Sequence, residues 1–252
     1  MPSQAKYFLY FMVLVSLFSF FPIMIITLSP PKIKEEFQWR KPLVGSTLVL
    51  IYILGMTAVF FPKSCSKIFH GNEKGIGSNS NVLFHRKEYF QKSCRIFTIT
   101  LTHGHHPICQ GFLHHEFQID KKTFCTACMG LFSGAIVSIF GVVAYFFLEY
   151  PIAKYAGFFV TFGVAGVVLG LLQYIFLDFR RKPIRFFLNA FFIFGMFLIL
   201  VGIDNDVQSL VLDFFLISLF VFWLFTRILL SKWQHTKICS ACDLDCSLKE
   251  ES

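Results

Sequence analysis

Long apolar stretches separated by shorter charged ones make up most of this chain. About 20 consecutive apolar residues are enough for a helix to cross the hydrocarbon core of a bilayer. Six apolar stretches are at least this long or close to it. The last of them, 207–230, contains Asp213 and Arg227, but each lies near an end, where a charged group can reach the interface. The pattern predicts an all-α membrane protein with six transmembrane helices. The other five stretches carry no charge and cover residues 7–28, 42–61, 129–148, 155–177 and 186–203.

The composition agrees with this class of protein. Hydrophobic residues make up 55% of the 252 residues and charged residues only 15%, whereas about a quarter of the residues of soluble domains are charged. The first apolar stretch is longer than the apolar core of a secretory signal and shows no clear cleavage site of small residues. We therefore expect it to be retained as a helix of an integral membrane protein.

Few polar residues interrupt the apolar stretches. Gln173 and Asn189 are the main ones, and we expect them to form a hydrogen bond between the fourth and fifth helices. Small residues spaced four apart at 130–134 and 166–170 are typical of helices that approach a neighbour closely. The thin polar inventory favours packing over a transport pathway.

Lysine and arginine are distributed unequally between the two sides that six helices define. Eighteen of the 23 lie in the N-terminus, the segments 62–128 and 178–185, and the C-terminal part. The positive-inside tendency therefore predicts that both termini and the long segment are cytosolic. The resulting organisation is helices 1 and 2 in residues 1–61, a cytosolic loop in 62–128, helices 3 to 6 in 129–230 and a cytosolic tail in 231–252.

The net charge of +8 follows mostly from this topology. It favours contact with anionic lipid head groups at the cytosolic face of the bilayer. Nucleic-acid binding requires a basic stripe on a folded face, often with exposed aromatic residues. We see no such arrangement and expect no nucleic-acid partner.

Two pairs of potential metal ligands lie in the C-terminal part of the cytosolic loop. His106 and Cys109 form the first pair, Cys125 and Cys128 form the second, and fifteen residues separate Cys109 from Cys125. This spacing is typical of a tetrahedral zinc site, in which each pair chelates from one turn. All eight cysteines lie on the predicted cytosolic side, where reducing conditions disfavour disulfides. The pattern predicts bound zinc, with iron as the alternative metal.

A second group of ligands follows the last helix. His235, Cys239, Cys242 and Cys246 form a possible second site, which either holds its own ion or lends cysteines to the first site. Cys65 and Cys94 stand apart from both groups, and we expect them to be unliganded. Several further histidines, at positions 103, 105, 114 and 115, could replace His106 or surround the metal ligands without binding the ion, and His114 and His115 by themselves are expected to be solvated loop residues.

The local setting of the second pair is informative. Cys125 and Cys128 stand at the start of the third predicted helix, where unpaired amides and the helix dipole favour the thiolate. Thiolate serves both metal ligation and redox chemistry, so both stay open. Upstream, residues 71–81 are typical of a flexible connector and residues 95–101 of a short strand.

The pattern Cys125-x-x-Cys128-x-Gly130-x-x-x-Gly134, preceded by His106, Cys109 and Gln110, resembles the family called domain of unknown function 2085. That family comprises small polytopic prokaryotic membrane proteins with a Cys/His element before such a helix start. The resemblance covers residues 105–134. The second element matches position by position and the first only loosely, since the family's Cys-His-Gln order and its following Arg-Ser-Phe are absent here. The resemblance implies no particular activity.

These patterns favour a non-enzymatic membrane protein with a structural zinc site in a cytosolic loop, acting as a docking or sensing element. One alternative is a membrane thiol-disulfide oxidoreductase that uses Cys125 and Cys128. Another is a metal-ion transporter with cytosolic ligands. No phosphate loop, catalytic triad or paired-carboxylate site is found, and we expect Asp204 and Asp206 to cap a short turn. The sequence leaves a homo-oligomer or a protein partner open.

Overall fold

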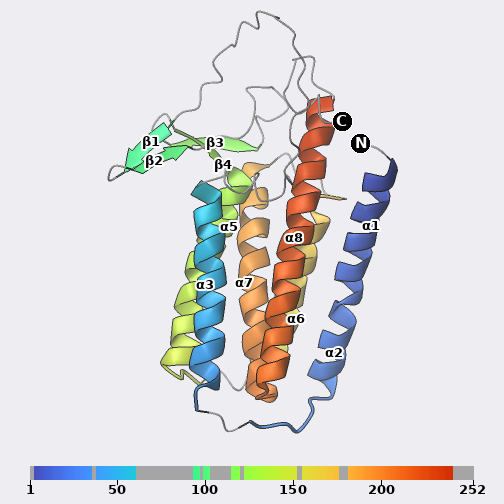
Figure 1. Ribbon diagram of the computed structural model, residues 1–252, viewed down its shortest axis with the longest axis vertical. Coiled ribbons are helices and arrows are strands. Elements are labelled where there is room, and N and C mark those ends of the chain that lie inside the picture. Colours follow the sequence, from blue (N-terminus) through green and yellow to red (C-terminus); the bar gives the residue numbers. More distant parts are fainter. Residues whose placement is uncertain are drawn as a thin grey trace, which may run out of the picture.

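A computed structural model describes residues 3–35, 38–60, 93–96, 99–102, 115–119, 122–151, 155–175 and 181–240 of the chain. Long helices run side by side, and two small β-hairpins lie at one end of them (Figure 1). The helices are α1 (Ser3–Phe18), α2 (Phe20–Leu28), α3 (Arg40–Phe60), α5 (Thr126–Val142) with the π-helical turn η2 (Val143–Phe147), α6 (Ala156–Leu172), α7 (Lys182–Asp206) and α8 (Leu210–Ser240). The strands are β1 (Ser93–Ile96), β2 (Ile99–Thr102), β3 (Glu116–Ile119) and β4 (Lys122–Cys125).

Five helical segments are long and apolar enough to cross a membrane, which confirms the prediction of an all-α integral membrane protein. They are Tyr7–Leu28, Arg40–Val59, Thr126–Phe147, Lys182–Asp206 and Leu210–His235. The remaining predicted stretch, 155–177, forms α6, which has 17 residues. At 1.5 Å per residue α6 is about 26 Å long. It ends earlier than predicted, where the side chain of Gln173 donates to the carbonyl of Gly170 at 2.8 Å.

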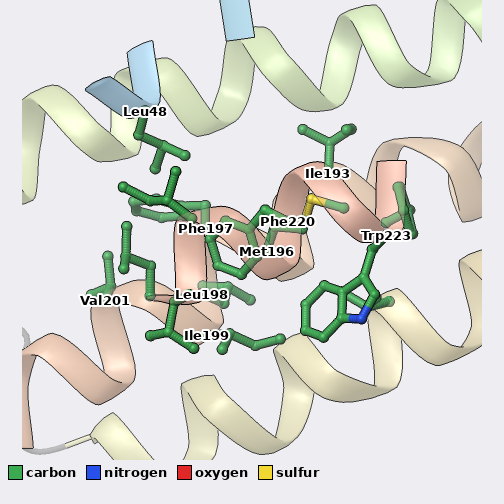
Figure 2. Close-up of a cluster of buried hydrophobic side chains, with 14 of the residues drawn as sticks. Leu48, Ile193, Met196, Phe197, Leu198, Ile199, Val201, Phe220 and Trp223 are labelled. Carbon is green, nitrogen blue, oxygen red and sulfur yellow. The ribbon is translucent and has the colours of Figure 1, made fainter. Parts of the chain in front are cut away.

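Helix α7 forms the centre of the bundle. Of its most apolar 18-residue window, 67% is buried, against 22–39% for the other four long segments. Its side chains Ile193, Met196 and Phe197 lie in the hydrophobic core together with Phe220 and Trp223 of α8 (Figure 2). A helix that is buried on most of its surface fixes the positions of its neighbours.

Glycines bring α5 and α6 against the backbone of α7. A methyl group placed on Gly134 of α5 would lie 2.4 Å from the carbonyl oxygen of Ala190, and one on Gly166 of α6 would lie 2.7 Å from that of Phe191. Both distances are shorter than a carbon–oxygen contact allows, so only glycine fits. The close approach predicted from the small residues at 130–134 and 166–170 is confirmed.

The hairpins, the start of α1 and the end of α8 lie at the same end of the bundle, and the connection from α2 to α3 lies at the other (Figure 1). The single strand predicted over residues 95–101 is wrong, because β1 and β2 divide this stretch and pair antiparallel, with Ser93 opposite Thr102. The pairing satisfies backbone groups that a lone strand leaves unpaired. Which side of a membrane this end faces stays a prediction.

The glycine contacts generate a test with an internal control. Gly134→Ala forces a methyl group against the α7 backbone, so we expect it to lower the free energy of unfolding by about 1–3 kcal/mol. Gly55→Ala in α3, where nothing lies within 4 Å of the added methyl, should not lower it, since alanine favours the helix. Thermal unfolding of the detergent-solubilised protein measures both. Equal effects of the two substitutions would contradict the packing described here.

Candidate functional site

The predicted ligands Cys125 and Cys128 stand where the β3–β4 hairpin joins α5. Cys125 is the last residue of β4 and pairs with Glu116, and Cys128 lies in the first turn of α5. Cys125 is buried and Cys128 is half-buried. The amide of Thr126 donates to the carbonyl of His115 at 2.9 Å, so the hairpin continues up to the helix. The hairpin thereby fixes where the two thiols enter the bundle.

Gly130 sets the position of these cysteines against α7. A methyl group on Gly130 would lie 2.3 Å from the carbonyl oxygen of Phe186. The start of α5 therefore touches the first turns of α7, next to Arg185. The close approach explains why glycine follows Cys128 by two residues.

His115 and Arg185 are in direct contact beside the cysteines. Nη1 of Arg185 lies 2.5 Å from Nδ1 of His115, and both side chains are buried. A guanidinium only donates, so the ring nitrogen that faces it accepts and carries no proton. The expectation that His115 is a solvated loop residue is wrong, because the hairpin places it under the end of α8.

The end of α8 completes this group of side chains. The rings of His115 and His235 meet edge to face with centroids 6.0 Å apart, and Nη1 of Arg185 donates to Oε1 of Gln234 at 3.3 Å. Cys239 follows one turn after His235 in the same helix. We call His115, Cys125, Cys128, Arg185 and His235 the cysteine-end cluster.

The described parts of the two predicted metal sites therefore lie at one end of the bundle. Cys125, Cys128 and His235 belong to them, whereas His106, Cys109, Cys242, Cys246 and the side chain of Cys239 fall outside the described residues. Within those residues, no group of three or more His, Cys, Asp and Glu side chains can hold a metal ion. Both sites stay predictions.

A buried polar network lies directly below the cysteine-end cluster. The amide oxygen of Asn189 accepts from Nε of Arg227 at 3.0 Å and from the hydroxyl of Tyr174 at 3.1 Å. Its amide nitrogen donates to Gln173 at 3.2 Å and to the carbonyl of Arg185 at 2.7 Å. The predicted bond between Gln173 and Asn189 is confirmed.

Arg227 does not reach the interface, contrary to the prediction. It is 5% exposed, and its guanidinium lies 5.5 Å from the centre of the Tyr174 ring. Tyr174 is within electrostatic range of both arginines and of both cysteines, Cys125 and Cys128. The positive end of α5 favours the thiolate form of the cysteines at its start.

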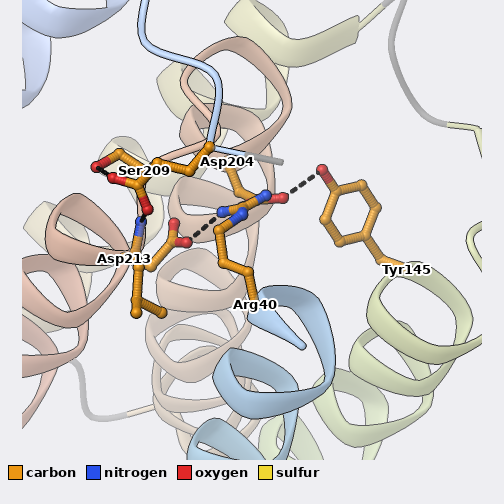
Figure 3. A network of polar contacts seen from close by, with 7 residues as sticks. Arg40, Tyr145, Asp204, Ser209 and Asp213 are labelled. Carbon is orange, nitrogen blue, oxygen red and sulfur yellow. Dashed lines mark hydrogen bonds and ion pairs between the residues drawn. The ribbon is translucent and has the colours of Figure 1, made fainter. Parts of the chain in front are cut away.

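A second buried group of charges lies at the opposite end of the bundle (Figure 3). Nη1 of Arg40, the first residue of α3, contacts a carboxylate oxygen of Asp204 and one of Asp213. The second oxygen of Asp204 accepts from the hydroxyl of Tyr145 at 2.8 Å. We call Arg40, Tyr145, Asp204 and Asp213 the carboxylate cluster.

The carboxylate cluster corrects two expectations. Asp204 was expected to cap a turn and Asp213 to reach the interface, yet both are fully buried. Helix α7 continues to Asp206 and places Asp204 inside the bundle. There the guanidinium of Arg40 stabilises the carboxylate of Asp204 in place of hydrating water. The signal in the sequence was the position of the three residues, since each stands near the end of an apolar stretch on the same predicted side.

Glu35, in the segment before α3, binds the start of α8. Its carboxylate accepts from the amide of Leu210 and from the hydroxyl of Ser209, both at 2.9 Å. These hydrogen bonds lower the pKa of Glu35 below its usual 4.5. The bond from the Leu210 amide has the larger effect and the bond from Ser209 the smaller one. Glu35 satisfies an amide that the first turn of a helix leaves unpaired.

No family model matches this chain, and no curated protein or solved structure matches it either. The resemblance of residues 105–134 to domain of unknown function 2085 therefore stays a prediction.

Asn189→Ala tests the network below the cysteines. It removes the acceptor that faces Arg227 and leaves this charge buried, so we expect a loss of about 2–3 kcal/mol in the free energy of unfolding. Asn205→Ala is the control, because the side chain of Asn205 bonds only to its exposed neighbour Asp206 among the described contacts. Denaturant unfolding in detergent compares the two. A similar small loss in both variants would refute a structural role for the network.

Glu35→Gln tests the contact between the α2–α3 connection and α8. A carboxylate with a lowered pKa stabilises the fold above its unfolded pKa, and this stabilisation is lost as the pH falls. The variant should therefore melt below the wild type at pH 7, and the difference should shrink as the pH falls through the lowered pKa of Glu35. Melting curves recorded as the pH is lowered from 7 measure this. A difference that persists in acid would show that charge is not involved.

Proposed function

We propose that this chain is a six-helix membrane protein whose cysteine-end cluster is part of a structural zinc centre, with iron as the alternative metal. The centre would organise the 62–128 segment into a cytosolic docking or sensing element without enzymatic activity. The observation that carries the proposal is that the hairpin bearing Cys125 and the end of α8 bearing His235 lie at the same end of the bundle, where the rings of His115 and His235 meet.

The contacts of Arg185 support a centre that combines the loop with the tail. One guanidinium touches His115 next to the hairpin and Gln234 next to His235. The described ends of the two ligand-bearing segments, His115 before the hairpin and Gln234 beside His235, therefore lie near each other. The tail could bind its own ion or provide ligands to the loop site. These contacts favour the second alternative.

Charge also supports thiolate ligation here. Zinc bound by three or four thiolates has a net negative charge, which nearby cations stabilise. Arg185 lies at the same end of the bundle as the two cysteines, in contact with His115, which directly precedes β3 of their hairpin. Because a metal site of this kind forms only when its ligands are brought together, metal binding would be coupled to the folding of this end.

The six-helix topology rests on α6 as the sixth crossing. It is shorter than the five other segments, and its glycines pack on the central helix as those of α5 do. Six crossings put both termini on one side of the membrane, which the lysine and arginine count makes the cytosolic side. Anionic lipid head groups are the natural partners of this basic face.

A thiol-disulfide oxidoreductase is the second candidate, and the setting of Cys125 favours it. A Cys125 thiolate, favoured by its place at the start of α5, attacks a partner disulfide, forms a mixed disulfide and releases one partner thiolate. Cys128 would then displace the second, which leaves an oxidised Cys125–Cys128 pair and a reduced partner. This chemistry needs no metal, so the two candidates separate experimentally.

Elemental analysis of the purified, detergent-solubilised chain tests the proposal. We expect about one zinc or iron per chain, as four ligands around one ion require. Cys125→Ser and Cys128→Ser should abolish most of the bound metal, and His235→Ala should lower it if the tail contributes. Cys94→Ser, which changes a cysteine of β1 expected to be unliganded, should leave the metal content unchanged.

Two outcomes would count against a structural metal centre. One is less than one metal per chain, unaffected by Cys125→Ser. The other is a disulfide between Cys125 and Cys128 that forms and disappears with redox conditions in thiol trapping, without bound metal. The second outcome would establish the oxidoreductase instead.

A further inference from the structure

The carboxylate cluster contains one more acid than base. Arg40 supplies a single positive charge, whereas Asp204 and Asp213 supply two carboxyl groups, and all three side chains are at least 97% buried. If both acids were ionised, the cluster would hold a net negative charge in a region that excludes water. Such a charge is neutralised by a bound proton or cation.

The shared contact of the two acids with Arg40 points to a proton as the occupant. One carboxylate oxygen of Asp204 and one of Asp213 touch the same nitrogen atom of Arg40, so the two carboxyl groups are held close together. Two ionised carboxylates this close repel each other, and uptake of one proton by the pair removes the repulsion.

The surroundings of the two acids differ. Each oxygen of Asp204 receives a donor, one from Arg40 and one from the hydroxyl of Tyr145. One oxygen of Asp213, Oδ1, is buried without a hydrogen-bond partner among the described residues. An ionised group needs its oxygens satisfied more than a neutral one does. Asp204 is therefore the better carboxylate and Asp213 the better acid.

We propose that the carboxylate cluster is a proton-binding site, in which Asp213 carries the proton, Asp204 stays ionised, and the neutral cluster holds α3 against α7 and α8. This site lies at the opposite end of the bundle from the cysteines and is independent of any metal bound there. Loss of the proton leaves two carboxylates against one guanidinium and weakens the junction of the three helices.

Other charged groups around the pair come from each neighbouring element. Lys41 of α3 lies with Nζ 5.3 Å from the centre of the Tyr145 ring, and Glu35 of the preceding segment acts electrostatically on Arg40. Tyr145 itself donates to Asp204. Lys41 and Glu35 offset each other in sign, so the balance within the cluster decides its protonation.

Infrared spectroscopy of the full chain in lipid nanodiscs tests this inference. At pH 7 the wild type should show the carbonyl band of a protonated carboxyl group that is shielded from solvent. Asp213→Asn should remove this band, whereas Asp206→Asn, which changes the exposed acid at the end of α7, should leave it intact. Absence of the band in the wild type, or its persistence in Asp213→Asn, would overturn the proposal.

Thermal unfolding as a function of pH provides the second measurement. An acid that is protonated in the folded state and ionised in the unfolded chain makes stability fall as the pH rises from about 4. Asp213→Asn keeps the neutral shape, so its melting temperature at pH 7 should match or exceed that of the wild type, and this part of the pH dependence should disappear. Asp204→Asn should lower the melting temperature at pH 7, because Arg40 and Tyr145 lose their anion.

The two aspartate variants also separate a proton from a metal cation. If sodium or another cation neutralised the cluster, both substitutions would be harmful at pH 7 and the melting temperature of the wild type would rise with the concentration of that cation. Either result would overturn the assignment of a proton.

Discussion

A guanidinium that leaves water for the interior of a helix bundle loses several kcal/mol of hydration unless other groups replace it. This bundle buries Arg40, Arg185 and Arg227 among its described residues. Helix α7 provides Asp204 as a partner of Arg40 and Asn189 as a partner of Arg227. Arg185 is itself a residue of α7. The arrangement of α3, α7 and α8 therefore depends on satisfying these three cations, because moving any of these helices would separate a buried charge from its partner.

The close packing around α7 keeps these polar partners in position. Glycines of α5 and α6 let their backbones touch that of α7, so the helices cannot slide without a clash. Asn189, one turn beyond Arg185, donates to its carbonyl and accepts from Arg227. Gly130 meets α7 at Phe186, so the start of α5, which carries Cys128, is held close to the first turns of α7. The packing of apolar helices thereby positions the polar groups that carry chemistry.

The apolar stretches and the glycine spacing could be read from the sequence because they reflect local constraints. A helix needs a fixed length to cross lipid, and a close crossing needs small residues every fourth position. Gln173 and Asn189 were paired correctly because each was an isolated polar residue in an adjacent predicted helix. Asp204 and Arg227 were misjudged for the opposite reason. A charge near the end of an apolar stretch can face either the interface or the interior, and only the packing of distant helices decides between them.

The charges of α7 are placed against its own dipole. Arg185 stands in its first turn and Asp204 in its last, whereas a helix prefers acids at its start and bases at its end. In α8 the order is the favourable one, with Asp213 at the start and Lys237 at the end. The dipole contributes about 0.3–1 kcal/mol per charge, while a hydrogen bond to a charged group contributes about 1.5–3 kcal/mol. The bonds that Asp204 receives from Arg40 and Tyr145 therefore outweigh the dipole, which alone would make Asp213 the ionised partner. Since α7 gains nothing from these charges as an isolated helix, their value lies in the contacts that they make with α3, α8 and the hairpin.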